Sequence, residues 1–531
     1  MEFNKATLDI CNKLIYSLVI MLTKIWSAAN YGLEAVQIET EVNVAEKGFP
    51  GFTVVGLASK AVEEAKERVK TAIVNSEMEF PTAKITVNLA PADLPKEGAC
   101  YDLPIAVGIL ASSGQIELPK ERAYFFGELS LDGSLRHSRG VFLLAILAKE
   151  KGVKKIYVPR LCANEAVVVE GIEVYPVDNL TNLIKHLRGN KLINALNYVE
   201  SKELLDEALV QFDFSEILGQ ESAKRALEIA AAGGHNIFLI GPPGSGKTML
   251  SRALPGILPP LSEAESLEVT KIYSITGNIP PGGSLIRNRP FRSPHHTTSQ
   301  VGLIGGGSNP RPGEISLSHR GVLFIDEFPE VSRMSLEALR QPLEDGYVCI
   351  SRASGSVSFP CQFMLVAAAN PCPCGYLGDE KKECKCNIHQ IMNYQKKLSG
   401  PILDRIDIHL NVPSVDVNKL MIGNNSNLAE KSEIIRERVI RAREIQKKRF
   451  ENTKGIYSNS DMKNKHLKEW AKIEDSANLL LKQAVNKFSL SARTYFRLIK
   501  VSRTIADLAN CENIKDIHIA EALQYRIRTG E

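Results

Sequence analysis

The feature that most constrains this chain is a glycine-rich loop between a short apolar run and a helical pattern. The run Asn236–Ile240 is followed by Gly241-Pro242-Pro243-Gly244-Ser245-Gly246-Lys247-Thr248, which matches G-x-x-x-x-G-K-[ST]. Glycines let backbone N–H groups approach negatively charged phosphates, and the N-terminus of the following helix adds its dipole. We therefore expect a nucleoside triphosphate (ATP) site, with Lys247 at the β- and γ-phosphates and the Thr248 hydroxyl on Mg²⁺. A chance glycine-rich turn is the alternative.

Two further strand-like runs end in polar residues that suit the same site. Val322–Ile325 is followed by Asp326 and Glu327, and Phe363–Ala369 is followed by Asn370. In open α/β sheets, ligands bind at the carboxyl ends of the strands. We expect Asp326 to hold Mg²⁺, Glu327 to orient and activate the attacking water, and Asn370 to hydrogen-bond the γ-phosphate or the water. Taken alone, a strand-terminal asparagine is more often a cap.

Two arginines are candidates for contacting the charge that develops during phosphoryl transfer. Arg405 lies in the run Gly-Pro-Ile-Leu-Asp-Arg-Ile-Asp at 400–407, and Arg493 begins a helix that Ser491 caps. An arginine delivered to the transition state can raise the rate by orders of magnitude. Surface ion pairs are the alternative for both, and spacing alone does not decide.

Four of the ten cysteines crowd into one short segment past Asn370. Two C-x-C pairs, with nine residues between them, supply Cys372, Cys374, Cys384 and Cys386. Four thiolates can hold tetrahedral Zn²⁺, although this spacing is tighter than the usual C-x₂₋₄-C. We expect a structural zinc site, because four thiolates leave no open position for substrate. A reduced cysteine-rich loop is the alternative.

Length and composition indicate an intracellular protein with several domains. The 531 residues suggest about three domains, and 44% hydrophobic with 24% charged residues suit globular folding. No run approaches the ~20 apolar residues that span a bilayer, and we expect a cytoplasmic protein with reduced thiols and no membrane contact. Net charge is only +4, so a nucleic-acid surface has to be a local basic patch or a ring of patches in an oligomer.

Changes of pattern divide the chain into five segments. Residues 1–20 suit an added leader before Met21; the alternative is a signal peptide, which this segment faintly resembles. Residues 21–188 are mixed α/β, with strand-like runs at 34–44, 84–89 and 155–158 and helical patterns at 61–75, 103–112 and 142–151. Residues 189–211 suit a linker, 212–415 an α/β core with the cysteine insertion, and 416–531 a helical domain.

Together these motifs resemble the AAA+ clade that contains magnesium chelatase motor subunits and MCM helicases. Runs at 289–299 (RPFRSPHHTTS), 313–321 (GEISLSHRG) and 339–346 (LRQPLEDG) resemble the YifB/ComM family of magnesium-chelatase-like proteins, a similarity that covers about 21–525. It implies an AAA+ P-loop α/β core with a C-terminal all-helical lid. It also implies Arg405 as the finger acting on the neighbouring subunit's ATP, Arg493 as the sensor-2 residue, and a homo-hexameric ring.

The N-terminal domain resembles the α/β fold of Lon proteases, of the ribosomal S5 domain 2-like type. The resemblance rests on Pro95–Cys100 before an apolar helix, and on Gly127–Leu129 through Arg139-Gly140 before another. In that family a serine and a lysine form the catalytic dyad. Cys100 takes the place of the serine and Phe142 that of the lysine. We therefore expect a non-proteolytic relative in which Cys100 is a packed residue.

The resemblance implies an ATP-driven ring motor on DNA, with helicase or branch-migration activity in recombination or natural transformation. The basic segment Gly282–Pro312 could line a central channel, as single-strand binding demands, or pack against the next subunit. The basic helical run Arg436–Arg449 is either a solvated face or a DNA contact. One rival is a chelatase-type motor that inserts metal into a tetrapyrrole or cofactor, although the chain has no D-x-S-x-S motif. Another is a remodelling or scaffold protein that uses ATP only to assemble.

Overall fold

The chain forms two compact units. The computed structural model describes residues 22–526, except 46–48, 58–59, 95, 97, 201–211, 280–282, 308, 353–354, 380, 399, 415–429, 454 and 489; the expected leader at 1–20 lies outside these residues. Unit 1 comprises Met1–Leu205 and Ser266–Ile286, and unit 2 comprises Asp206–Glu265 and Arg287–Glu531. Residues 266–286, which we expected in the ATPase core, thus group with the N-terminal residues. Within the described ranges, every helix is too short or too polar to cross a lipid bilayer.

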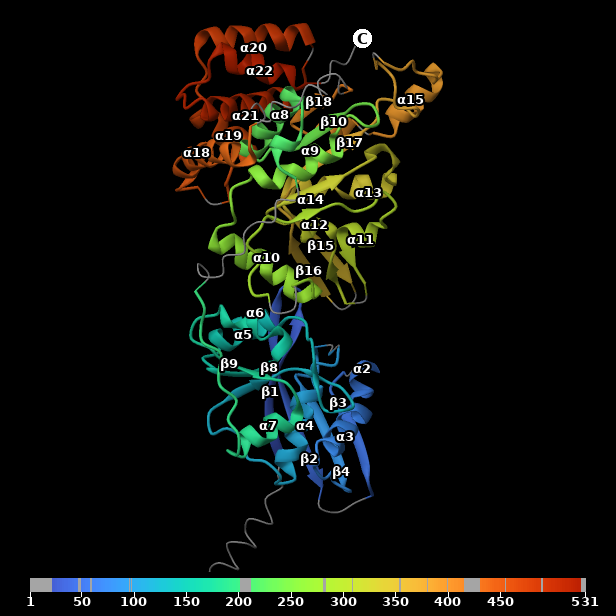
Figure 1. The fold of residues 1–531 in the computed structure, drawn as a ribbon, viewed down its shortest axis with the longest axis vertical. Coiled ribbons are helices and arrows are strands. Elements are labelled where there is room, and N and C mark those ends of the chain that lie inside the picture. The colour runs from blue at the N-terminus through green and yellow to red at the C-terminus, as the bar shows by residue number, and fades with distance from the viewer. Residues whose placement is uncertain are drawn as a thin grey trace, which may run out of the picture. The chain divides into compact units, whose positions relative to one another are not determined.

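Unit 1 is built on a seven-stranded mixed sheet in the order β3-β4-β2-β1-β5-β8-β9 (Figure 1). The pairs β1–β2 and β2–β4 are antiparallel and the other pairs are parallel. In β2 the buried residues Ile38, Thr40 and Val42 alternate with less buried neighbours, as the period of a strand requires. The strands of unit 1 are β1 (Leu22–Tyr31), β2 (Glu34–Ala45), β3 (Gly51–Val55), β4 (Lys84–Ala90), β5 (Ala123–Phe125), β6 (Glu128–Leu129), β7 (Leu135–Arg136), β8 (Lys155–Pro159) and β9 (Glu173–Val177).

Two helices that are apolar on all sides fill the cores of unit 1. Helix α4 buries every residue except Ala111, and α5 buries all except Ile146 and the exposed Lys149 and Glu150 at its end; a helix that is hydrophobic nearly all round belongs in a protein interior. Helix α4 packs on β1, β2 and α3, and α5 packs on β8 and α6. The helices of unit 1 are α2 (Lys60–Glu63), α3 (Ala65–Asn75), α4 (Asp102–Ser112), α5 (Val141–Glu150), α6 (Asn164–Val167) and α7 (Leu180–Leu187).

The expected elements of unit 1 are confirmed closely. The strands expected at 34–44, 84–89 and 155–158 and the helices expected at 103–112 and 142–151 each match within one residue at either end. The helix expected at 61–75 is instead divided into α2 and α3. Helix α10 (Glu263–Thr276) starts in unit 2 and continues into unit 1.

Unit 2 contains a five-stranded parallel sheet in the order β11-β14-β17-β10-β18, of which Figure 1 labels β17, β10 and β18. Strands β14 and β17 are buried at every residue, as central strands of a parallel sheet should be. Because all strands run in one direction, the carboxyl ends of β10, β14 and β17 lie at one edge, with β17 in the middle. The strands are β10 (Ile237–Ile240), β11 (Phe291–Arg292), β14 (Val322–Ile325), β17 (Met364–Ala369) and β18 (Ile408–Asn411).

Unit 2 also contains short helices and two hairpins. The hairpins pair β12 (Gly305–Gly306) with β13 (Arg311–Pro312), and β15 (Tyr347–Arg352) with β16 (Gly355–Pro360). The helices before the lid are α8 (Glu221–Gly233), α9 (Lys247–Ala253), α11 (Gln300–Ile304), α12 (Glu314–Leu317), α13 (Arg333–Ala338), α14 (Arg340–Asp345), α15 (Ile388–Lys396) and α16 (Gly400–Leu403).

The C-terminal helices share one hydrophobic core with the parallel sheet. Ile229 of α8, Val366 of β17 and Ile505 of α21 are all buried in it. The helices are α18 (Ser432–Phe450), α19 (Asn464–Trp470), α20 (Asp475–Phe488), α21 (Ala492–Leu508) and α22 (Asp516–Gln524). The fold is therefore the expected mixed α/β architecture with a parallel P-loop sheet and a C-terminal helical region.

Several arginines of the basic run on α18 form hydrogen bonds and ion pairs with other parts of unit 2. Arg443 donates to the Ala231 carbonyl at 2.9 Å, and Arg449 pairs with Asp507. Arg438 lies 2.5 Å from a carboxylate oxygen of Glu228. Arg441, Lys447 and Lys448 remain exposed. The run is thus neither a uniformly solvated face nor a continuous surface for DNA.

Candidate nucleotide-binding site

The polar residues expected at a nucleotide site follow three adjacent strands of unit 2. Gly241 follows β10, Asp326 follows β14 and Asn370 follows β17. The register sets Ile240 beside Ala369 and Ile325 beside Ala367, so the three strands end nearly level. The fold therefore brings the three motifs to one edge of the sheet.

The phosphate loop depends on its glycines. Gly244 and Gly246 have φ angles of 77° and 89°, in the left-handed region that glycine adopts without strain. A Cβ on Gly241 would lie 2.1 Å from the carbonyl oxygen of Val412, so the loop can approach the backbone just after β18 only with glycine at this position. Helix α9 begins at Lys247, directly after the loop.

The Lys247 ammonium lies buried among oxygen atoms. Its Nζ donates to the carbonyl oxygens of Gly241 at 2.7 Å and Pro242 at 2.9 Å, and lies 3.3 Å from Oδ1 of Asn370. Burial lowers the pKa of Lys247, against the raising effect of the nearby Asp326 carboxylate. A phosphate oxygen is a stronger acceptor for this cation than a carbonyl, because charge-assisted hydrogen bonds are the stronger ones.

Thr248 and Asp326 present oxygens at a spacing that suits Mg²⁺. The Thr248 hydroxyl donates to Oδ2 of Asp326 at 2.9 Å. Magnesium binds oxygens at about 2.0–2.1 Å in an octahedron, in which neighbouring ligands are about 2.9 Å apart. The other Asp326 oxygen, Oδ1, accepts from the backbone N–H of Glu327 at 2.9 Å. These residues therefore fit the cation that the nucleotide would bring.

Glu327 is held in an unusual conformation beside a histidine. Its φ of 48° is rare for a residue other than glycine, and such backbone strain is concentrated at functional sites. Its side chain is 55% exposed, and Oε2 lies 3.1 Å from Nδ1 of His296. His296 belongs to the basic run that we expected to contact DNA or a subunit. It therefore links that run to the candidate catalytic carboxylate.

The two expected arginines differ in their surroundings. Arg405 pairs with Glu344 of α14, also donates to the carbonyl of Pro401, and has a side chain only 11% exposed. Arg493 is exposed in the first turn of α21, and Ser491 caps this helix by accepting from the Thr494 N–H. The structure thus brings Lys247, Thr248, Asp326 and Asn370 into direct contact, but neither arginine joins them through a hydrogen bond or ion pair that it describes.

Sequence reasoning missed Arg497, one turn beyond Arg493. Its guanidinium lies 3.2 Å from Oδ1 of Asp407, and His235 Nδ1 lies 3.2 Å from Oδ2. Burial acts to raise the pKa of Asp407, but Arg497 and His235 outweigh it and hold the pKa well below its usual range. The sequence signal that could have found it is Asp407, the last residue of the Leu-Asp-Arg-Ile-Asp run, because a buried carboxylate needs a cationic partner.

The basic segment Gly282–Pro312 has two of its four arginines paired with glutamates elsewhere in unit 2, and its residues 282 and 308 lie outside the described ones. Arg289 pairs with Glu265 at 3.2 Å, and Arg292 pairs with Glu314 at 2.6 Å. Arg311 stays exposed in the β12–β13 hairpin. Arg352, exposed on the β15–β16 hairpin, donates to the Gly307 carbonyl at 3.2 Å. Sequence reasoning missed this second hairpin, although its alternating exposed and buried residues are a strand signal.

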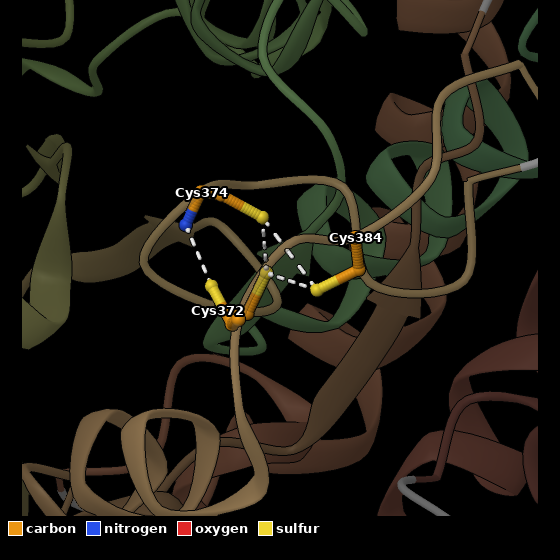
Figure 2. A group of neighbouring side chains, drawn as sticks. Cys372, Cys374 and Cys384 are labelled. Carbon is orange, nitrogen blue, oxygen red and sulfur yellow. Dashed lines mark hydrogen bonds between the residues drawn. The ribbon is translucent and has the colours of Figure 1, made fainter.

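The four clustered cysteines meet in the structure, and we call them the cysteine cluster: Cys372, Cys374, Cys384 and Cys386. Their sulfur atoms all lie within 4.8 Å of one another. Cys372, Cys374 and Cys384 point toward one another in Figure 2, with sulfur–sulfur distances of 3.4–3.7 Å. None of the four is in a disulfide. The two C-x-C pairs thus converge as a metal site would require.

The residues at the Lon-like dyad positions are unsuited to nucleophilic attack. Burial raises the pKa of the Cys100 thiol to about 12, so it stays protonated at neutral pH. Phe142 is fully buried in α5. A protonated thiol is a weak nucleophile, and a phenyl ring cannot act as a base.

The chain is similar to magnesium chelatase subunits and to whole proteins of one bacterial family. Residues 213–420 match the family described as "Magnesium chelatase, subunit ChlI", residues 40–161 match "Subunit ChlI of Mg-chelatase", and residues 429–526 match the ChlI C-terminal family. Competence protein ComM of Haemophilus influenzae is 43% identical over 513 residues, covering 95% of this chain and 97% of that protein. Uncharacterized protein YifB of Escherichia coli is 42% identical over 507 residues, covering 95% and 97%.

A more distant likeness extends to Lon proteases. Lon protease 2 of Bacillus subtilis is 27% identical over 198 residues, covering 32% of this chain and 34% of that protein. Taken with the P-loop sheet, the helical C-terminal region and the full-length relatives, these matches identify the chain as a member of the YifB/ComM family of magnesium-chelatase-like AAA+ ATPases.

Proposed function

We propose that this protein is a DNA-dependent ATPase that works as a homo-hexameric ring motor in the cytoplasm. The observation that carries the ATPase part is the contact between the Thr248 hydroxyl and Asp326, which joins the phosphate loop to the acidic strand end. The proposed activity is helicase or branch migration of DNA. Its support is the similarity along nearly the whole chain to a protein named for competence.

In the proposed reaction each residue acts on the triphosphate or on the attacking water. The loop Gly241–Thr248 binds the phosphates through its N–H groups, and Lys247 neutralises charge at the β- and γ-phosphates. Thr248 and Asp326 would hold Mg²⁺, which would neutralise negative charge on the phosphate oxygens. Asn370, already 3.3 Å from Lys247, hydrogen-bonds the γ-phosphate or the water.

Glu327 orients and deprotonates the water that attacks the γ-phosphorus in this scheme. The carboxylate is exposed enough to meet a water, although its contact with His296 has to loosen first. The bond from phosphorus to the β,γ-bridging oxygen breaks, ADP leaves with that oxygen, and inorganic phosphate carries the oxygen of the water. Arg405 of one subunit and Arg493 are proposed to neutralise the charge that develops.

The proposed DNA contact lies on the two hairpins of unit 2. Arg311 and Arg352 are exposed there, and Arg352 links the two hairpins by donating to the Gly307 carbonyl. Six copies in a ring would repeat these positive charges around a channel, and phosphate contacts of this kind bind a strand without reading its sequence. Such binding weakens steeply as salt rises.

A chelatase-type motor is the second candidate, favoured by the matches to magnesium chelatase subunits. One set of assays separates the two. ATP hydrolysis is measured with and without single-stranded or branched DNA at low salt, beside strand displacement. Stimulation of the ATPase rate by DNA would support the DNA motor. If DNA neither stimulates hydrolysis nor is retained by the protein, the DNA motor is ruled out. Activity that needs a partner protein and a porphyrin would support the chelatase.

A further inference from the structure

The sulfur atoms of the cysteine cluster have the spacing of a single tetrahedral metal site. Zinc binds thiolates at about 2.3 Å, so the sulfurs of a tetrahedral site are about 3.8 Å apart. The three measured distances are 3.4 Å for Cys372 to Cys374, 3.7 Å for Cys372 to Cys384 and 3.6 Å for Cys374 to Cys384. A disulfide, in contrast, needs about 2.05 Å.

The surrounding backbone supports thiolates at this place. The N–H of Cys374 points at the Cys386 sulfur, 3.4 Å away, and such donors stabilise a negatively charged sulfur. Cys372 is fully buried. Four ligands close the coordination shell, so the site is structural rather than catalytic. We propose that the cysteine cluster binds one Zn²⁺, and that the turn closed by this metal holds the phosphate loop and Asn370 in position for hydrolysis.

The cluster is directly connected to the nucleotide site. Asn370 is separated from Cys372 by one residue, so fixing the Cys372 sulfur also restricts the backbone of Asn370. Gly375 donates its N–H to the Cys372 carbonyl at 3.0 Å. A Cβ on Gly375 would lie 2.6 Å from Cδ of Pro243 and 3.7 Å from Cγ of Asn370. The turn between the two C-x-C pairs thus lies against the phosphate loop itself.

The segment that carries the cluster has little else to order it. Between β17, which ends at Ala369, and α15, which begins at Ile388, its described residues form turns and bends rather than helix or strand. Ser414, shortly after β18, donates to Asp379 at 3.1 Å. A metal can supply the folding free energy that so small a polar segment lacks. Binding releases thiol protons to solvent and involves no redox step.

Metal content of the purified full-length protein tests the site itself. We expect about one equivalent of zinc per chain by elemental analysis, and a thiolate-to-cobalt absorption band after exchange with Co²⁺. Cys386→Ser should lose most of this metal, whereas Cys349→Ser, on an exposed cysteine of β15, should keep it. Less than half an equivalent in the unsubstituted protein, one equivalent of iron, or unchanged zinc in Cys386→Ser would overturn the assignment.

A glycine pair tests whether the turn acts on the nucleotide site. Gly375 and Gly378 have φ angles of 86° and 75°, so alanine strains the backbone similarly at both, but a Cβ on Gly378 meets nothing within 4 Å. We expect Gly375→Ala to retain zinc and to lower kcat for ATP by about tenfold or more relative to Gly378→Ala, because small misplacements are costly. Equal rates for two zinc-loaded, folded variants would overturn the positioning role.

The positioning role rests on the proposed ATPase function, and the two can fail separately. A zinc-loaded protein that hydrolyses no ATP under any condition would contradict the ATPase proposal while leaving the metal site intact. An active ATPase without metal would contradict the metal site alone.

Discussion

The Thr248 hydroxyl donates a 2.9 Å hydrogen bond to Oδ2 of Asp326, which lies 78 residues further along the chain. This contact closes the site between β10 and β14, two strands that are separated in the sheet by β17. Everything proposed about ATP and magnesium depends on this pair, because one side chain comes from the phosphate loop and the other from the acidic strand end.

Replacing the hydroxyl tests this pair. Thr248→Val keeps the shape of the side chain but removes one proposed magnesium ligand. We expect the magnesium-dependent ATPase rate to fall by about 100-fold or more, while the thermal midpoint of unfolding changes little. Ser251→Ala is the matched control, because the Ser251 hydroxyl lies on the same helix and donates to the Lys247 carbonyl at 2.8 Å. A Thr248→Val protein with the normal rate would contradict the proposed ligand.

Two arginines one turn apart on α21 should behave in opposite ways. Arg497→Met leaves the buried Asp407 carboxylate without its guanidinium partner, and we expect unit 2 to lose about 2–4 kcal/mol of stability. Arg493 is exposed, so Arg493→Met should leave stability unchanged and lower turnover of ATP by about tenfold or more. Thermal unfolding and ATPase rates of the two variants decide this. If Arg493→Met unfolds early, its assigned role is wrong.

Mixed rings test whether Arg405 acts on a neighbouring subunit. Arg405→Ala removes the proposed finger, and Glu327→Gln removes the proposed base, so each variant alone should be inactive. In a mixed ring, an Arg405→Ala subunit keeps its own Glu327 and can receive Arg405 from a Glu327→Gln neighbour. We expect part of the ATPase activity to return on mixing. If labelled subunits exchange but activity stays absent, Arg405 acts within its own subunit or only through its pairing with Glu344.

Glu165 makes unit 1 sensitive to pH. Burial raises the pKa of this carboxyl from its ordinary 4.5 to about 7, against the hydrogen bond that it accepts from Ser274 at 2.6 Å. His137 lies 3.8 Å away, and burial and Arg139 lower the pKa of that imidazole. Between about pH 4.5 and 7, Glu165 is therefore protonated in the folded state but ionised in the unfolded state. The free energy of unfolding consequently falls as pH rises through this window.

Glu165→Gln should remove this dependence. Relative to the glutamine variant, the unsubstituted protein should lose up to about 3 kcal/mol of stability between pH 4.5 and 7. Above that range, the difference in stability between the two proteins should stay constant. The measurement is the difference between the two thermal midpoints as a function of pH, in which other titrating groups largely cancel. A constant difference would show that Glu165 titrates at its ordinary pKa.

The sequence predicted features that are encoded in short contiguous runs. The buried strand Val322–Ile325 and the glycine loop 241–248 are such runs, because a parallel strand buried on both faces is a continuous apolar run and a phosphate loop needs fixed glycines. The cysteine spacing likewise predicted that four thiols converge. In each case nearby residues carry the whole signal.

Contacts between distant segments could not be predicted in this way. The pairing of Arg497 with Asp407, the meeting of His296 with Glu327, and the internal ion pairs of Arg289 and Arg292 all depend on how strands and helices pack. A basic residue has the same local sequence signal whether it meets a carboxylate or a DNA phosphate. The grouping of residues 266–286 with unit 1 has the same cause, because α10 is a single helix whose sequence does not mark the boundary.

The most direct test of the ATPase proposal compares the unsubstituted protein with Glu327→Gln, which keeps the size of the side chain but removes the base. Binding of ATP with magnesium and its hydrolysis are measured in parallel, with and without branched DNA. The account predicts that both proteins bind ATP, that only the unsubstituted protein turns it over, and that DNA raises its rate. Undiminished hydrolysis by Glu327→Gln, or a folded unsubstituted protein that takes up no nucleoside triphosphate, would contradict it.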